Sequence, residues 1–171
     1  TRNLPNFNHV SGKKSEDQFE ESFKFMLPGY NARPLEMSGA IGIEQLKKLR
    51  GFIEIRRRNA KFFQSLFADH PYIDIQQETG LSSWFGFSLT LKENAPYDRS
   101  KLVGLLASNG VECRPVVTGN FLKNKGVLEY FDYEVSGEVD AAEHLDVNGL
   151  FVGNHQVNIE KKIERLGSLL L

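Results

Sequence analysis

The stretch from Gly29 to Leu46 constrains the fold more than any other, because a polar turn in it runs directly into a helix. Pro34 suits the first turn of that helix, since its fixed φ is helical and its missing N–H is not needed there. Glu36 places an acid at the positive end of the helix dipole. The pattern therefore predicts that Asn31 and Arg33 lie at a rigid helix edge.

Behind this edge the helix carries apolar residues and several small ones. The apolar residues are Leu35, Ile41, Ile43, Leu46 and Leu49, and the small ones are Ser38, Gly39, Ala40 and Gly42. Glycine within a helix costs about 1 kcal/mol relative to alanine, so we expect a closely packed neighbour to compensate. From the residues alone, the simpler interpretation is a buried helix with a polar first turn.

Length and charge limit the possible functions of the chain. Its 171 residues are enough for one domain with a sizeable core, and its net charge of −1 gives no electrostatic grip on nucleic acid or an anionic membrane. No apolar run approaches the roughly 20 residues that span a bilayer. We therefore expect neither a nucleic-acid partner nor a membrane partner.

Cysteine and histidine usage argue against a metal site. Cys113 is the only cysteine, which excludes an internal disulfide and fits a cytoplasmic protein. The four histidines lack metal-ligand spacing, and His155 is interpreted as a structural or exposed loop residue. The first residues contain no signal sequence and no initiator methionine, so we expect the chain to be cut from a longer protein.

Hydrophobic periodicity predicts an alternation of helices and short strands. The expected helices cover 34–68, as one long helix kinked or broken near 49–51, and then 99–108, 121–130, 139–147 and a final stretch after 158. The expected strands cover 72–75, 84–91, 111–117 and 150–153. The final helix carries Ile159, Ile163, Leu166 and Leu170 on one face. This order predicts a small α/β sandwich with one helix layer on a mixed or antiparallel sheet.

Two groups of arginines could bind anions. Arg114 is expected at a strand end and is followed by Thr118-Gly119-Asn120, a turn with free backbone N–H groups, which suits a phosphate or carboxylate. Pairing with a nearby glutamate explains Arg114 equally well. Arg56, Arg57 and Arg58 point in different directions around a helix, so we interpret them as a solvated face rather than a phosphate patch.

Four blocks of sequence resemble one enzyme family. Tyr-Asn-x-Arg-Pro-x-x-x-x-Gly-Ala-x-Gly-x-x-Gln-Leu is followed by Ser-Ser-Trp-Phe-Gly-Phe, Glu-Cys-Arg-Pro-Val-Val-Thr-Gly-Asn-Phe-Leu-Lys-Asn and Asn-Gly-Leu-Phe-Val-Gly-Asn-His-Gln. Together they resemble the C-terminal part of the DegT/DnrJ/StrS-type nucleotide-sugar aminotransferases, in particular the sugar 3-dehydratases among them. The resemblance implies the small C-terminal domain of the fold type I aminotransferases. Residues 1–30 would then be an arm from the cofactor-binding domain, 31–69 a linking helix or helices, and 70–171 the small α/β domain.

The resemblance also implies a reaction. Such enzymes use pyridoxal or pyridoxamine 5'-phosphate to remove the C3 hydroxyl of a 4-keto-6-deoxyhexose carried on a nucleoside diphosphate, and L-glutamate restores the amine. They act as homodimers in dideoxysugar biosynthesis for lipopolysaccharide O-antigen. The catalytic residues, including a histidine in place of the usual lysine, would lie upstream of Thr1, so we expect the chain alone to be inactive.

Four residues are carried over from the resemblance. Asn31 matches an asparagine that hydrogen-bonds the cofactor phosphate across the dimer interface. Arg2 and Arg114 match arginines that reach the nucleotide-sugar, where a bidentate contact would orient the diphosphate. Arg33 is a supporting candidate for the same site.

Two other functions stay open at this stage. An aminotransferase such as a perosamine synthase shares the fold and cofactor but retains the lysine. A non-catalytic sugar-nucleotide-binding or dimerisation module would explain why the chain has no self-contained active site. The features that separate these functions lie upstream of residue 1.

Overall fold

The structure is a computed structural model that describes residues 35–117 and 119–171. The chain forms two compact units, residues 1–43 and 44–171. Helix α2 (Glu36–Phe67) begins in the first unit and continues into the second. The predicted arm, residues 1–30, lies outside the described residues, and the division into linking helix and small domain stays a prediction.

Helix α2 is continuous over 32 residues and passes Leu49 to Gly51 without a break, so of the two expected alternatives, a kinked or a broken helix, the broken one is wrong. Ion pairs between neighbouring turns support the helix on both sides of Gly51, from Lys47 to Glu44 at 2.6 Å and from Arg50 to Glu54 at 3.3 Å. No described atom lies within 4 Å of a Cβ built on Gly39 or Gly42. The described residues therefore do not supply the close neighbour that we expected for these glycines.

The sheet has four antiparallel strands in the order β1-β2-β4-β3, which resolves the expectation of a mixed or antiparallel sheet. The strands are β1 (Ile73–Ile75), β2 (Gly86–Leu91), β3 (Cys113–Arg114) and β4 (Gly149–Gly153). Strand β3 is much shorter than the predicted 111–117. Pro115 follows it directly and has no N–H to continue the ladder.

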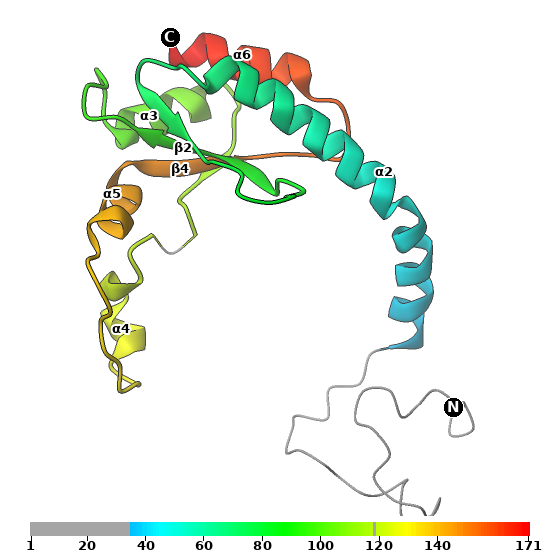
Figure 1. Ribbon diagram of the computed structural model, residues 1–171, viewed down its shortest axis with the longest axis horizontal. Coiled ribbons are helices and arrows are strands. Elements are labelled where there is room, and N and C mark those ends of the chain that lie inside the picture. The colour runs from blue at the N-terminus through cyan, green and yellow to red at the C-terminus, as the bar shows by residue number, and fades with distance from the viewer. Residues whose placement is uncertain (1–34, 118) are drawn as a thin grey trace, which may run out of the picture. The chain divides into compact units, whose positions relative to one another are not determined.

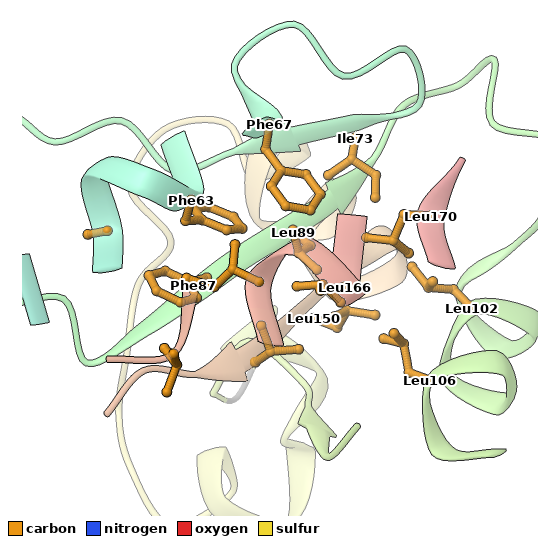
Figure 2. Close-up of a cluster of buried hydrophobic side chains, with 14 of the residues drawn as sticks. Phe63, Phe67, Ile73, Phe87, Leu89, Leu102, Leu106, Leu150, Leu166 and Leu170 are labelled. Atoms are coloured by element: carbon orange, nitrogen blue, oxygen red, sulfur yellow. The ribbon is translucent and has the colours of Figure 1, made fainter. Parts of the chain in front are cut away.

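One face of the sheet forms the hydrophobic core. Side chains from α2, α3 (Arg99–Ser108) and α6 (Glu160–Leu170) meet the inward residues of the strands, as Figure 2 shows. The buried members include Phe63, Phe67, Ile73, Phe87, Leu89, Leu102, Leu106, Leu150, Leu166 and Leu170. The ring of Phe63 stacks on Phe67 at 4.7 Å and on Phe87 at 4.4 Å between centroids. Three helices thus cover this face of the sheet.

The predicted limits of α3 are confirmed. Asp98 caps its first turn by accepting a hydrogen bond from the Lys101 N–H at 2.8 Å. The chain leaves the helix through Gly110, which has a φ of +71° that a glycine adopts without strain.

The predicted face of α6 is also confirmed, because Ile159, Ile163, Leu166 and Leu170 are all buried. The stretch between β3 and β4 forms a short 3-10 helix η1 (Phe121–Lys123), α4 (Lys125–Leu128) and α5 (Asp140–Asn148). In Figure 1, α6 and the C-terminal part of α2 lie on one side of β2 and β4, and α5 lies on the other side.

Candidate functional site

Among residues 35–117 and 119–171, only one end of the second face of the sheet is covered by a helix. Helix α5 packs against this face where β4 begins. The Leu145 carbonyl oxygen of α5 would lie only 2.5 Å from a Cβ built on Gly149, the first residue of β4. At the other end of β4, no described atom lies within 4 Å of a Cβ built on Gly153. The open end of this face is where the predicted site residue Arg114 lies.

Arg114 lies on edge strand β3, paired in register with Phe151 of β4. Its guanidinium is exposed and bonds to one carboxylate oxygen of Glu112, with Nη2 at 2.8 Å and Nε at 3.1 Å. No described residue accepts a hydrogen bond from Nη1 of Arg114. The pairing with a glutamate is therefore confirmed, and the role of Arg114 in binding an anion stays a prediction.

The sequence predicted free backbone N–H groups in the turn from Thr118 to Asn120. This prediction is wrong for Gly119 and Asn120, whose N–H groups both have acceptors. The Gly119 N–H donates to the carbonyl of Val116 at 2.8 Å, and the Asn120 N–H donates to Oδ1 of Asp146 at 3.2 Å. Gly119 has a φ of +57°, and its missing Cβ leaves room for the Asp146 carboxylate. Thr118 lies outside the described residues.

Lys123 ties this turn to α5. Its ammonium lies 2.6 Å from Glu143 Oε1 and 2.7 Å from Asp146 Oδ2. Hydrogen bonds to Asp146 and Glu143 raise the pKa of Lys123, and the bond from Lys123 lowers the pKa of both carboxyl groups. The cluster holds the segment after β3 in place but presents no free acid or base.

Arg56 holds the loop before β2, so the interpretation of a solvated arginine face is wrong for this residue. Its Nη2 donates to the carbonyls of Trp84 and Phe85 at 2.9 and 2.8 Å, and its Nε lies 3.1 Å from the Ser83 carbonyl. Its guanidinium also lies 5.9 Å from the centre of the Phe85 ring. Contacts from α2 thus fix the loop that leads into the open end of the sheet.

Two buried amides join the same loop to the chain after β4. Asn59 of α2 donates to Oδ1 of Asn154 and to the Val157 carbonyl, at 3.1 and 2.8 Å. Asn154 in turn donates to the carbonyls of Arg56 and Trp84, at 2.9 and 3.0 Å. No local sequence pattern signals this pair, because its two members lie 95 residues apart in the chain.

The remaining polar residues do not form a metal or catalytic cluster in the described ranges. No group of three or more His, Cys, Asp or Glu residues there could hold a metal ion. His155 is exposed, as interpreted, and burial followed by the charge of Glu112 raises the pKa of the free Cys113 thiol. None of the helices described is long and apolar enough to pass through a membrane.

Three of the four carried-over residues cannot be placed. Asn31, Arg2 and Arg33 lie outside the described residues, so their roles stay predictions.

A sequence model of the DegT/DnrJ/EryC1/StrS aminotransferase family matches residues 5–157. The GDP-4-keto-6-deoxy-D-mannose 3-dehydratase of Yersinia pseudotuberculosis is 66% identical over 99% of the chain, and that of Escherichia coli O55:H7 is 65% identical over the same share. The chain spans 43% and 44% of the length of these two relatives.

Solved structures agree with the sequence matches. The E. coli enzyme with bound hydrated PLP superposes on the whole chain with a TM-score of 0.87 and 64% identity, and the chain covers 44% of it. A mutant of this dehydratase, solved with bound GDP-perosamine, matches equally well, with a TM-score of 0.87 and 64% identity over the same shares of both chains. The sugar aminotransferase Spr1654 of Streptococcus pneumoniae, at 15% identity and a TM-score of 0.67, shares the fold alone. The predicted fold, the C-terminal portion of an aminotransferase-type structure, is therefore confirmed.

Proposed function

The chain belongs to the DegT/DnrJ/EryC1/StrS aminotransferase family, and we propose that it is the C-terminal part of a nucleotide-sugar 3-dehydratase. The complete enzyme removes the C3 hydroxyl of GDP-4-keto-6-deoxy-D-mannose. The observation that carries this proposal is identity of 65–66% to two such dehydratases over nearly the whole chain. The product class suggests a place in colitose and O-antigen biosynthesis in the cytoplasm.

In this proposal Arg114 binds the diphosphate of the substrate. Its planar donor fork is exposed, and Glu112 engages only Nε and Nη2 through a single oxygen. A diphosphate accepts parallel hydrogen bonds from such a fork and gains both affinity and a fixed orientation. Arg2 is proposed to share this task, with Arg33 supporting it.

Pyridoxal or pyridoxamine 5'-phosphate is the proposed cofactor, with L-glutamate as amino donor. The described residues after Arg114 offer no backbone cradle for the cofactor phosphate, because the N–H groups of Gly119 and Asn120 already donate to Val116 and Asp146. We place its site in the part of the enzyme that precedes this chain. Asn31 of the partner in a homodimer would donate to its phosphate.

The test uses the complete gene product that contains this chain, loaded with pyridoxal phosphate. Borohydride reduction followed by peptide mass spectrometry should find no pyridoxyl-lysine, because a dehydratase lacks that lysine, and incubation with substrate and glutamate should release the 3-deoxy product. A single modified lysine with an amino-sugar product would instead establish an aminotransferase such as a perosamine synthase. Absence of cofactor binding and of turnover would favour a non-catalytic module.

A further inference from the structure

The open end of the sheet carries two aromatic rings beside Arg114. Phe151 is paired in register with Arg114 across β3 and β4, and residues paired in this way place their side chains on the same face. The Phe85 ring lies 6.1 Å from the Phe151 ring at an angle of 49°. We call Phe85 and Phe151 the aromatic strip.

The backbone beside the strip is shaped to present it. Gly86 has no side chain, and a Cβ there would meet the Phe151 ring at 2.9 Å, so the glycine lets that ring lie over β2. Trp84 has a φ of +53°, a left-handed conformation that strains a non-glycine residue. This turn buries Trp84 while the next residue, Phe85, stays 75% exposed.

Polar contacts hold this strained turn in place. Arg56 and Asn154 both donate to the Trp84 carbonyl, and the Trp84 N–H donates to Oγ of Ser82 at 2.9 Å. Apart from its contacts with Phe151 and Arg56, the Phe85 ring is exposed, so a strained backbone here presents an aromatic surface beyond what the core needs. Such strain is typical of positions at which a ligand is bound.

Arg114 indicates which ligand the strip would meet. A guanidinium beside two tilted rings matches a ligand that carries a phosphate next to an apolar group. A nucleoside diphosphate 6-deoxyhexose has both, because its C6 methyl and ring C–H groups follow directly on the diphosphate. We propose that the aromatic strip contacts the apolar side of the 6-deoxyhexose while Arg114 holds the diphosphate, and that Arg56 is the positioning residue for Phe85. This inference rests on the proposed function.

The experiment measures binding of GDP and of a GDP-6-deoxyhexose to the complete gene product by calorimetry. Phe85→Ala and Phe151→Ala should each raise the Kd of the GDP-sugar by roughly tenfold, the scale for losing an apolar pocket contact, and leave the Kd of GDP unchanged. Phe85→Leu should restore much of the affinity. The exposed Phe131 between α4 and α5 provides the matched control, so Phe131→Ala should change neither Kd.

Arg56→Ala separates positioning from contact. It should raise the Kd of the GDP-sugar as Phe85→Ala does, and the double variant should be no worse than Phe85→Ala alone. Additive losses would overturn the positioning role of Arg56.

Three other results would overturn the strip proposal. An equal loss of GDP and GDP-sugar affinity would mean that the rings stack on the base. Phe85→Ala changes an exposed side chain, so this variant should fold. If its affinity for the GDP-sugar were unchanged, the strip would touch no ligand. Binding of the GDP-sugar by the wild type would then still support the proposed function. A wild-type protein that binds neither ligand would overturn the proposed function and the strip with it.

Discussion

The two faces of the sheet differ in what covers them and in how they are held. Three helices pack an apolar layer onto one face, and its rings and aliphatic side chains exclude water. The other face is packed by α5 at one end, and its open end is fixed by hydrogen bonds from Arg56 and Asn154 to backbone carbonyls. Apolar burial therefore stabilises this domain on one face, while polar contacts order the loop at the open end of the other face.

The largest loss of stability should come from the covered face. Phe63 is fully buried and stacks on both Phe67 and Phe87, so Phe63→Ala should lower the free energy of unfolding by about 3–5 kcal/mol. Urea unfolding followed by circular dichroism measures this change. A loss below that of Arg56→Ala would mean that the polar contacts contribute more to stability than the core does.

The next effect should come from the contacts that hold the open end. Arg56→Ala leaves the carbonyls of Trp84 and Phe85 without these donors and should lower the free energy of unfolding by about 1–3 kcal/mol. The same urea titration measures the loss, and Arg58→Ala on an exposed part of α2 serves as its control. Equal stability of the two variants would show that Arg56 does not hold the loop.

A pH effect should arise at His70, which is buried beside Phe67. Its Nδ1 accepts from the Tyr72 N–H at 3.2 Å, and burial, followed by the charge of Lys92, lowers its pKa from the usual 6.5. The unfolded chain therefore takes up a proton before the folded one does. This contribution to stability is complete above about pH 6.5, is lost as the pH falls from there toward the lowered pKa, and is fully lost below it.

Unfolding titrations between pH 7.5 and about pH 5 should detect this loss, over the range in which an ordinary histidine takes up its proton. His70→Asn keeps an acceptor near the Nδ1 position but cannot be protonated, so it should flatten the profile. The exposed His155→Asn is the matched control and should leave the profile unchanged. A profile that stays steep in His70→Asn would assign the pH dependence to other groups.

The smallest change in stability should come from Arg114. Its ion pair with Glu112 is exposed, with 66% of the arginine side chain accessible, so Arg114→Ala should change the free energy of unfolding by less than about 0.5 kcal/mol. In the complete gene product the same substitution should weaken GDP binding, measured by calorimetry. A large loss of stability with intact GDP binding would place Arg114 in the fold rather than in the site.

Local signals in the sequence predicted the elements well where the physical cause is local. Asp98 and Gly110 bracket α3, and the stripe from Ile159 to Leu170 defines the buried side of α6. The break near Gly51 was wrong, because a single glycine costs less than the surrounding helix gains. β3 proved shorter than its pattern, since Pro115 ended the ladder.

The residues of the candidate site were harder to predict from the sequence than the helices and strands. Arg114 could be proposed from the sequence because it lies at the end of a strand pattern and precedes a proline. Arg56 and the Asn59–Asn154 pair act on partners that only the folded chain brings near, so spacing along the sequence could not identify them. The aromatic strip depends on strand register between β2 and β4, which hydrophobic alternation does not specify.

The short outer strands of the sheet also bear on how the protein behaves at high concentration. β1 has three residues and β3 has two, and Pro115 removes the next donor on the β3 edge. An edge this short offers few free backbone groups to a strand of another molecule, so edge-to-edge aggregation has little to build on. Strand β3 is short, so Arg114 lies at the end of an edge strand, and a strand of another molecule finds few partners with which to extend the sheet.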